Sequence, residues 1–178
     1  MTTSYESRPL FEMREAPRSG SEYDVLTITL HNLRAVVAWK LTGLAEAAAK
    51  RSLVDSATTV LGLVNHLAWV EAWWFQDVFA GAEVDYPFDW DEDEDAEFRM
   101  TDDHTVEGVL DVYQANLSRS NEIIAGAGSL EDTVDKNGRT YSLRWILAHM
   151  IDETARHAGH MDILREQLDG ATGYFPND

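Results

Sequence analysis

Residues 143–170 read LRWILAHMIDETARHAGHMDILREQLDG and carry the strongest helical pattern of the chain. The apolar side chains of this stretch recur at helical spacing, at Leu143, Ile146, Met150, Met161 and Leu164. Such spacing is typical of one buried face of a long helix. Ser142 can cap the start of the helix, and Gly170 can end it just beyond Leu168. The sequence therefore predicts a long amphipathic helix from residue 143 to about residue 168.

Three segments upstream show the same periodicity. The first begins at Ser21 and is expected to span about 20 residues or more, with an apolar stripe at Leu26, Leu30, Leu33, Val37, Leu41 and Leu44. An alanine-rich piece up to Lys50 follows, as a bent continuation or as a separate short helix. The second helix runs from residue 58 or 59 to about 80, and the third from about 105 to 125. Residues 129–140 contain Asn137-Gly138 and predict a turn or a short hairpin. Four long amphipathic helices predict an all-α four-helix bundle.

The connection between the second and third helices is too long for a simple turn. Nine of the fifteen residues from 83 to 97 are acidic, which predicts a solvated loop. A helix of about 22 residues is roughly 33 Å long, and a segment of this length can span that distance. We therefore expect residues 82–104 to form a long acidic crossover, after which the third helix can run parallel to the second.

Length and composition limit the classes of function. A chain of 178 residues predicts a single domain over residues 1–178, with residues 1–20 as an N-terminal extension. It contains no cysteine, so a thiol must come from another molecule. The formal charge of −18 makes nucleic acid a poor partner. No apolar run approaches the roughly 20 residues of a membrane helix, and the first residues lack a secretory pattern. We expect a cytoplasmic protein without membrane contact.

The residues suited to chemistry gather on two of the predicted helices. His149, Glu153, His157 and His160 follow steps of four, four and three residues, so they share one strip of the last helix. His66 lies on the second helix. A carboxylate and an imidazole one turn apart, with an imidazole from a facing helix, supply three metal ligands and leave a position for water or substrate. The alternative is an exposed Glu153–His157 pair and a buried structural His66.

Other residues permit further readings. His160 can move a proton and is our candidate catalytic residue, while His149 can orient a ligand, although both can equally be structural. Tryptophans can line a substrate pocket, but at helical spacing they more often belong to the core; they are Trp69, Trp73, Trp74 and Trp90. The acidic run can bind cations or a basic partner, and the exposed face of the aromatic helix can support a homodimer.

Two stretches resemble a known superfamily. Residues 143–170 closely resemble the last helix of the DinB-like superfamily, in particular an uncharacterised branch related to mycothiol-dependent S-transferases and maleylpyruvate isomerase. Residues 60–75, VLGLVNHLAWVEAWWF, resemble its second helix. With the helix order and the crossover, the resemblance covers about residues 22–173. It implies a four-helix bundle with a divalent metal on His66, Glu153 and His157. Many members have histidine in place of Glu153, and the Glu–His combination is more similar to the isomerase.

The resemblance also implies an activity. It points to a metal-dependent thiol S-transferase, which adds a low-molecular-weight thiol to an electrophilic small molecule. Mycothiol is the first candidate for this thiol. Zinc suits two imidazoles and a carboxylate, and nickel, iron and manganese also fit. Two alternatives stay open. One is a thiol-dependent isomerase or a hydrolase at the same site, and the other is a metal-binding stress or interaction protein without turnover.

Overall fold

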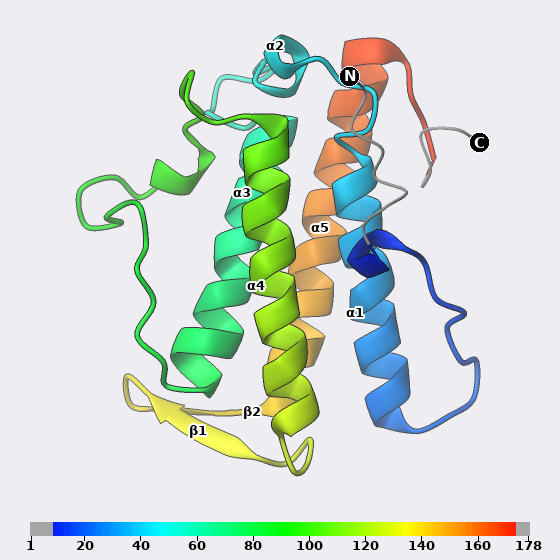
Figure 1. The fold of residues 1–178 in the computed structure, drawn as a ribbon, viewed down its shortest axis with the longest axis vertical. Coiled ribbons are helices and arrows are strands. Elements are labelled where there is room, and N and C mark those ends of the chain that lie inside the picture. Colours follow the sequence, from blue (N-terminus) through cyan, green and yellow to red (C-terminus); the bar gives the residue numbers. More distant parts are fainter. Residues whose placement is uncertain (1–8, 174–178) are drawn as a thin grey trace.

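A computed structural model describes residues 9–173, and four long helices lie side by side in it (Figure 1). They are α1 (Glu22–Trp39), α3 (Val60–Glu71), α4 (Val106–Gly126) and α5 (Leu143–Asp169). α3 continues directly into a π-helical segment, Ala72–Phe79. A short helix, α2 (Glu46–Ala49), lies between α1 and α3 in the chain. The described residues are mostly helical, as the periodicity predicted. The expected turn or hairpin is a two-stranded sheet, in which β1 (Thr133–Lys136) pairs antiparallel with β2 (Arg139–Ser142).

The segment between α3 and α4 is a crossover. In Figure 1, α3 and α4 run in the same direction, opposite to α1 and α5, and the chain between them climbs the length of the bundle on its outside. Residues 82–104 therefore return the chain from the end of the π-helical segment to the start of α4. This parallel arrangement leaves α3 next to α5 on its other side, where both helices contribute candidate metal ligands.

Local chemistry explains where the helices begin and end. Hydroxyl side chains accept backbone N–H groups at the starts of the long helices, from Ser21, Thr59, Thr105 and Ser142. Gly170 adopts φ 78°, which ends α5 in the left-handed conformation that favours glycine. The prediction for α1 was too long: α1 ends at Trp39, and Leu41 and Leu44 lie in the following turn. Leu41 is still buried there, so its helical spacing reflected the core and not the helix.

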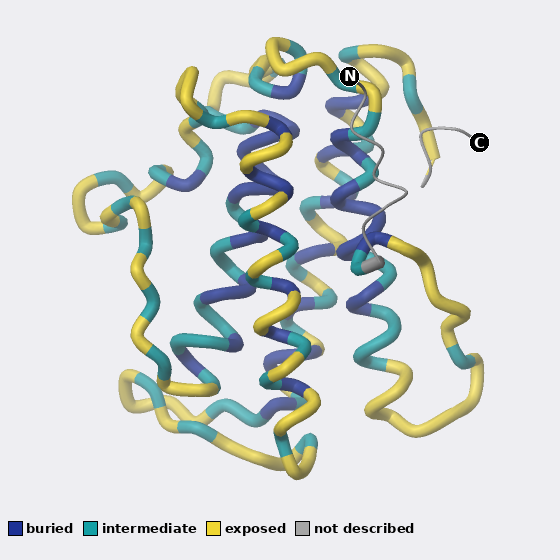
Figure 2. Tube along the Cα trace, in the orientation of Figure 1, coloured by how far each residue is buried: buried dark blue, intermediate teal, exposed yellow. Residues whose placement is uncertain are grey.

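Part of the N-terminal extension belongs to the core. Phe11 is 1% exposed, and its ring stacks on Tyr113 of α4 with a centroid distance of 6.0 Å. Glu12 contributes its carbonyl oxygen to the ring of His31 at 2.7 Å. Residues 1–8 of the predicted extension lie outside the described residues, as do residues 174–178. The buried positions lie where the helices face one another (Figure 2), and Phe11 belongs to the same core cluster.

The acidic crossover is only partly the solvated loop that the sequence predicted. Along residues 83–90, exposed and half-buried positions alternate, as Figure 2 shows by its changing colours. Tyr86, Phe88 and Trp90 face inward, because successive side chains of an extended chain point to opposite sides. Phe88 meets Trp69 at 5.7 Å and Trp90 meets Trp73 at 5.8 Å, both edge to face. Asp85 and Asp89, which flank these rings in the sequence, are exposed, so their charge does not prevent the segment from docking onto the helix.

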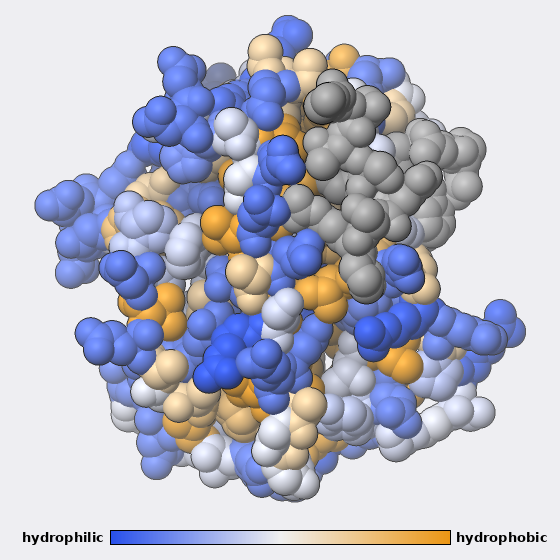
Figure 3. All heavy atoms as spheres, viewed as in Figure 1, coloured by the Kyte–Doolittle hydropathy of each residue, from blue (hydrophilic) through white to orange (hydrophobic). Residues whose placement is uncertain are grey.

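The face seen in Figure 3 is mainly hydrophilic, with apolar side chains in small separate groups. None of the helices within residues 9–173 combines the length and the apolarity needed to cross a bilayer.

The cap of α4 provides a test of these local interactions. Thr105 Oγ1 accepts the N–H of Gly108 at 3.0 Å. Replacing Thr105 by Ala removes this acceptor and is expected to lower the free energy of unfolding by about 1 kcal/mol. Thr105→Ser keeps a hydroxyl and should leave stability close to that of the wild type. Urea unfolding measures both variants, and equal loss in the two would show that the hydroxyl does not act as a cap.

Candidate metal centre

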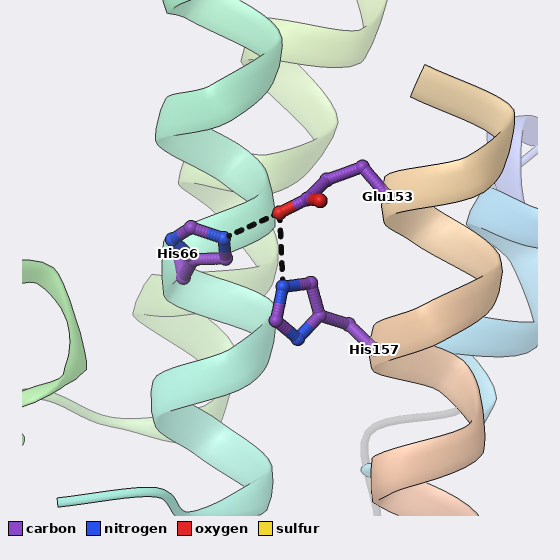
Figure 4. A group of neighbouring side chains, drawn as sticks. All are labelled: His66, Glu153 and His157. Atoms are coloured by element: carbon purple, nitrogen blue, oxygen red, sulfur yellow. Dashed lines mark hydrogen bonds and ion pairs between the residues drawn. The ribbon is translucent and has the colours of Figure 1, made fainter. Parts of the chain in front are cut away.

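His66, Glu153 and His157 meet between α3 and α5 (Figure 4). His66 projects from α3, and Glu153 and His157 project from α5 one turn apart. Glu153 Oε1 lies 3.2 Å from His66 Nε2 and 3.0 Å from His157 Nε2. One donor atom from each of the three residues lies within 4.8 Å of the other two. The structure thus brings together the three residues that the sequence singled out as ligands.

Neighbouring residues on α5 explain how the cluster is placed. Thr154 and Ala158 are buried against the other helices and fix the rotation of α5. Glu153 and His157 each precede one of them and therefore lie at the edge of the buried stripe, with side chains 16% and 13% exposed. The His66 side chain is 12% exposed. The cluster is therefore mostly withdrawn from water but still accessible from one side.

Hydrogen bonds within the cluster shift the pKa values of its members. Those from His157 and then from His66 hold the pKa of Glu153 far below its usual range, despite partial burial. Burial alone would lower the pKa of His66, but hydrogen bonds to Glu153 and to Glu97 outweigh it, and the net shift is upward. Glu153 is therefore a carboxylate in the metal-free protein.

The acidic crossover adds a fourth residue, which the sequence analysis missed. Glu97 is 7% exposed, and its Oε1 lies 3.1 Å from His66 Nδ1. Its Oε2 accepts the indole N–H of Trp90. Burial raises the pKa of Glu97, but hydrogen bonds from His66 and other donors give a net lowering. Glu97 is one of nine acidic residues in the run, and the sequence did not distinguish it from the others. Its one distinguishing feature is its position next to Phe98, where the run ends.

The two other histidines of the strip have different surroundings. His160 is exposed, and its Nδ1 lies 3.4 Å from His157 Nδ1. His149 lies outside the cluster: its ring stacks on Trp145 at 5.0 Å and meets Trp74 edge to face at 4.8 Å. The strip therefore divides, with His160 next to a candidate ligand and His149 in an aromatic group.

The donor set suits a divalent cation. Two imidazole nitrogens and one carboxylate oxygen are donors that zinc and related transition metals accept, and three protein ligands leave a further position open. Ligand atoms around one zinc ion lie roughly 3–4 Å apart, which follows from metal–ligand bonds of about 2 Å. The donor atoms already lie within 4.8 Å of one another, so small rotations of the side chains are sufficient.

The chain is a member of the DinB-like superfamily, and its helical bundle with a long crossover is the fold expected of that class. Within that class, the sequence model of the mycothiol S-transferase family matches residues 25–170. The chain therefore belongs to the mycothiol S-transferase family. Neither the search of curated proteins nor that of solved structures found a match.

Proposed function

We propose that this protein is a metal-dependent thiol S-transferase that joins a low-molecular-weight thiol to an electrophilic carbon of a small molecule. Mycothiol is the first candidate for the thiol. The observation that carries the proposal is the cluster of His66, Glu153 and His157 in a chain of the mycothiol S-transferase family. The chain has no cysteine, so the sulfur of the product comes from the thiol substrate. Family membership supports the thiol, and the cluster supports the metal dependence.

A divalent cation held by His66, Glu153 and His157 would lower the pKa of a coordinating thiol and keep it as thiolate at neutral pH. We take zinc as the first candidate, because imidazole and carboxylate are common ligands of catalytic zinc, with nickel, iron and manganese as alternatives. The ring of Phe98 stacks on His66 at 4.5 Å and supplies an apolar wall beside the cluster. An apolar electrophile can lie against this wall, partly shielded from water.

The reaction needs a place for one proton. The S–H bond of the thiol breaks and a sulfur–carbon bond forms, while the leaving group departs with its bonding electron pair. If the thiol adds to the electrophile and no group leaves, the adduct takes up a proton. We propose that His160 receives the proton of the thiol and passes it to solvent, because its ring is exposed and lies 3.4 Å from His157. His149 has no part in this step, since it packs among aromatic rings.

The product distinguishes a transferase from the alternatives. Zinc-loaded protein, mycothiol and a panel of alkyl halides, activated aryl halides and epoxides are expected to yield a stable thioether faster than the same mixture without protein. Mass spectrometry of the products provides the measurement. Recovery of free thiol with an isomerised substrate would indicate an isomerase, and turnover without thiol would indicate a hydrolase. Absence of turnover across the panel would contradict the transferase proposal.

The role of His160 has its own test. His160→Gln is expected to lower kcat by about 100-fold, which is typical for loss of a general base, when it is compared with the wild type at equal zinc content. Steady-state kinetics and elemental analysis on the same sample measure both quantities. A variant with wild-type kcat would show that the proton leaves by another route.

A further inference from the structure

The crossover touches the candidate metal centre through Glu97, and the two carboxylate oxygens of this residue have different partners. Oε1 lies 3.1 Å from His66 Nδ1, and Oε2 accepts the indole N–H of Trp90, which lies on the same crossover. The Glu97 side chain is 9% exposed. Because both oxygens have partners and water is mostly excluded, the carboxylate is held in one orientation.

The surface of α3 is suited to receive the backbone of this segment. Asn65 Nδ2 donates to the carbonyl oxygen of Glu97 at 2.7 Å. At Gly62, a Cβ atom would lie only 2.7 Å from the carbonyl oxygen of Phe98. Only glycine allows the crossover to approach α3 this closely at that position. One turn of α3 therefore makes three contacts with the crossover. Gly62 leaves room for its backbone, Asn65 donates a hydrogen bond to it, and His66 faces Glu97.

The two ring nitrogens of His66 face opposite partners. Nε2 faces Glu153 and, beyond it, His157, whereas Nδ1 faces Glu97. An imidazole that binds a cation through Nε2 keeps its proton on Nδ1, and an acceptor at Nδ1 selects this tautomer and orients the ring. Glu97 is not a member of the group of close donor atoms found among the described residues, which comprises His66, Glu153 and His157. Glu97 therefore contacts the candidate ligand His66 and is not itself one of the candidate ligands.

We propose that Glu97 is a positioning residue of the metal centre: it accepts Nδ1–H of His66 and thereby directs the Nε2 lone pair of His66 toward Glu153 and His157. The inference rests on the metal site of the proposed function. Since Glu97 is carried by the crossover, metal affinity depends on the docking of the crossover onto α3. By linkage, a bound metal stabilises the docked crossover to the same extent.

Zinc affinity of the metal-free protein, measured by competition with a chelating dye, tests this role. Glu97→Gln is expected to bind Zn²⁺ about 10- to 100-fold more weakly than the wild type, as for other partners of metal-binding histidines. Glu94→Gln is the matched control: it makes the same change at an exposed position of the same crossover and should keep wild-type affinity. Trp90→Phe removes the indole N–H and part of the ring but keeps an aromatic side chain and the Glu97 carboxylate, and it should weaken binding less than Glu97→Gln.

Two further measurements separate positioning from a general loss of structure. Gly62→Ala changes no charge and no ligand, yet it displaces the crossover and is expected to weaken zinc binding as Glu97→Gln does. In NMR spectra of the zinc-loaded wild type, the Nδ1–H proton of His66 should be protected from exchange with solvent by its hydrogen bond to Glu97, and Glu97→Gln should reduce that protection. Hydrogen exchange of residues 96–100 should slow when zinc binds to the wild type.

Each result supports or overturns the proposal. Wild-type zinc affinity in Glu97→Gln would overturn it and leave the proposed function intact. Loss as complete as in His66→Ala would also overturn it, because Glu97 would then be a ligand. Failure of the wild-type chain to bind zinc would remove the metal centre and both proposals together.

Discussion

The variant in which His66, Glu153 and His157 are all replaced by Ala is expected to carry no divalent metal, whereas the wild type carries about one equivalent per chain. The substitution removes two imidazole nitrogens and the carboxylate that lies between them. The surface carboxylates that remain bind cations weakly and release them on dialysis. Elemental analysis of protein purified without a histidine tag provides the measurement. Thioether formation by the variant should fall to the rate without protein.

A neighbouring carboxylate provides the matched control. Asp152 lies on the same helix as Glu153, but its side chain is 66% exposed and pairs with Arg156 at 2.9 Å. Asp152→Asn should therefore retain the metal and the activity. Equal metal content in the wild type and the triple variant would show that the cluster is not the binding site. Circular dichroism of all three proteins verifies that the helices are retained.

The second large effect concerns stability and lies at the contact of α1 with α3. Arg34 and Glu71 are 2% and 1% exposed and form two parallel hydrogen bonds, Nε to Oε1 at 2.7 Å and Nη2 to Oε2 at 2.6 Å. Glu71→Leu leaves the guanidinium buried without its counter-charge. We expect the free energy of unfolding to fall by about 3–5 kcal/mol, measured by urea unfolding, because an unpaired buried charge is strongly destabilising.

Two comparisons identify the cause of that loss. The double variant Arg34→Met, Glu71→Leu removes both charges and should recover most of the stability, since apolar side chains of similar volume often replace buried ion pairs without loss. Glu122→Gln breaks the exposed pair with Arg119 and should leave stability nearly unchanged. If Glu71→Leu alone were as stable as the wild type, the buried pair would not hold α1 against α3.

The sequence predicted the ligand set of the candidate centre for two different reasons. Glu153 and His157 are four residues apart, and helical geometry alone puts them on one strip. His66 has no such local relation to them: its place on another helix of the bundle made it a candidate, and the resemblance of residues 60–75 to the superfamily implied that it is a ligand. Whether metal binds these residues remains a prediction that elemental analysis tests.

The crossover shows where the sequence reading was incomplete. Its many carboxylates predicted a solvated loop, and that prediction did not take account of the alternation of Tyr86, Phe88 and Trp90 with Asp85, Pro87 and Asp89. That alternation predicts an extended segment with one apolar side, and the structure shows this side packed against α3 and the π-helical segment that continues it. The composition of the crossover therefore led to a wrong prediction for this segment, whereas the periodicity of its apolar residues would have predicted the packed side.

The amino-acid sequence alone specified the long helices, their caps and the strip of donors on α5, because these features depend on residues three or four positions apart. It did not reveal the contact of His66 with Glu97 or of Arg34 with Glu71, which join residues 31 and 37 positions apart. Such contacts arise only when helices and crossover pack together, since packing selects which of many carboxylates is buried beside which cationic partner. Local periodicity contains no information on that selection.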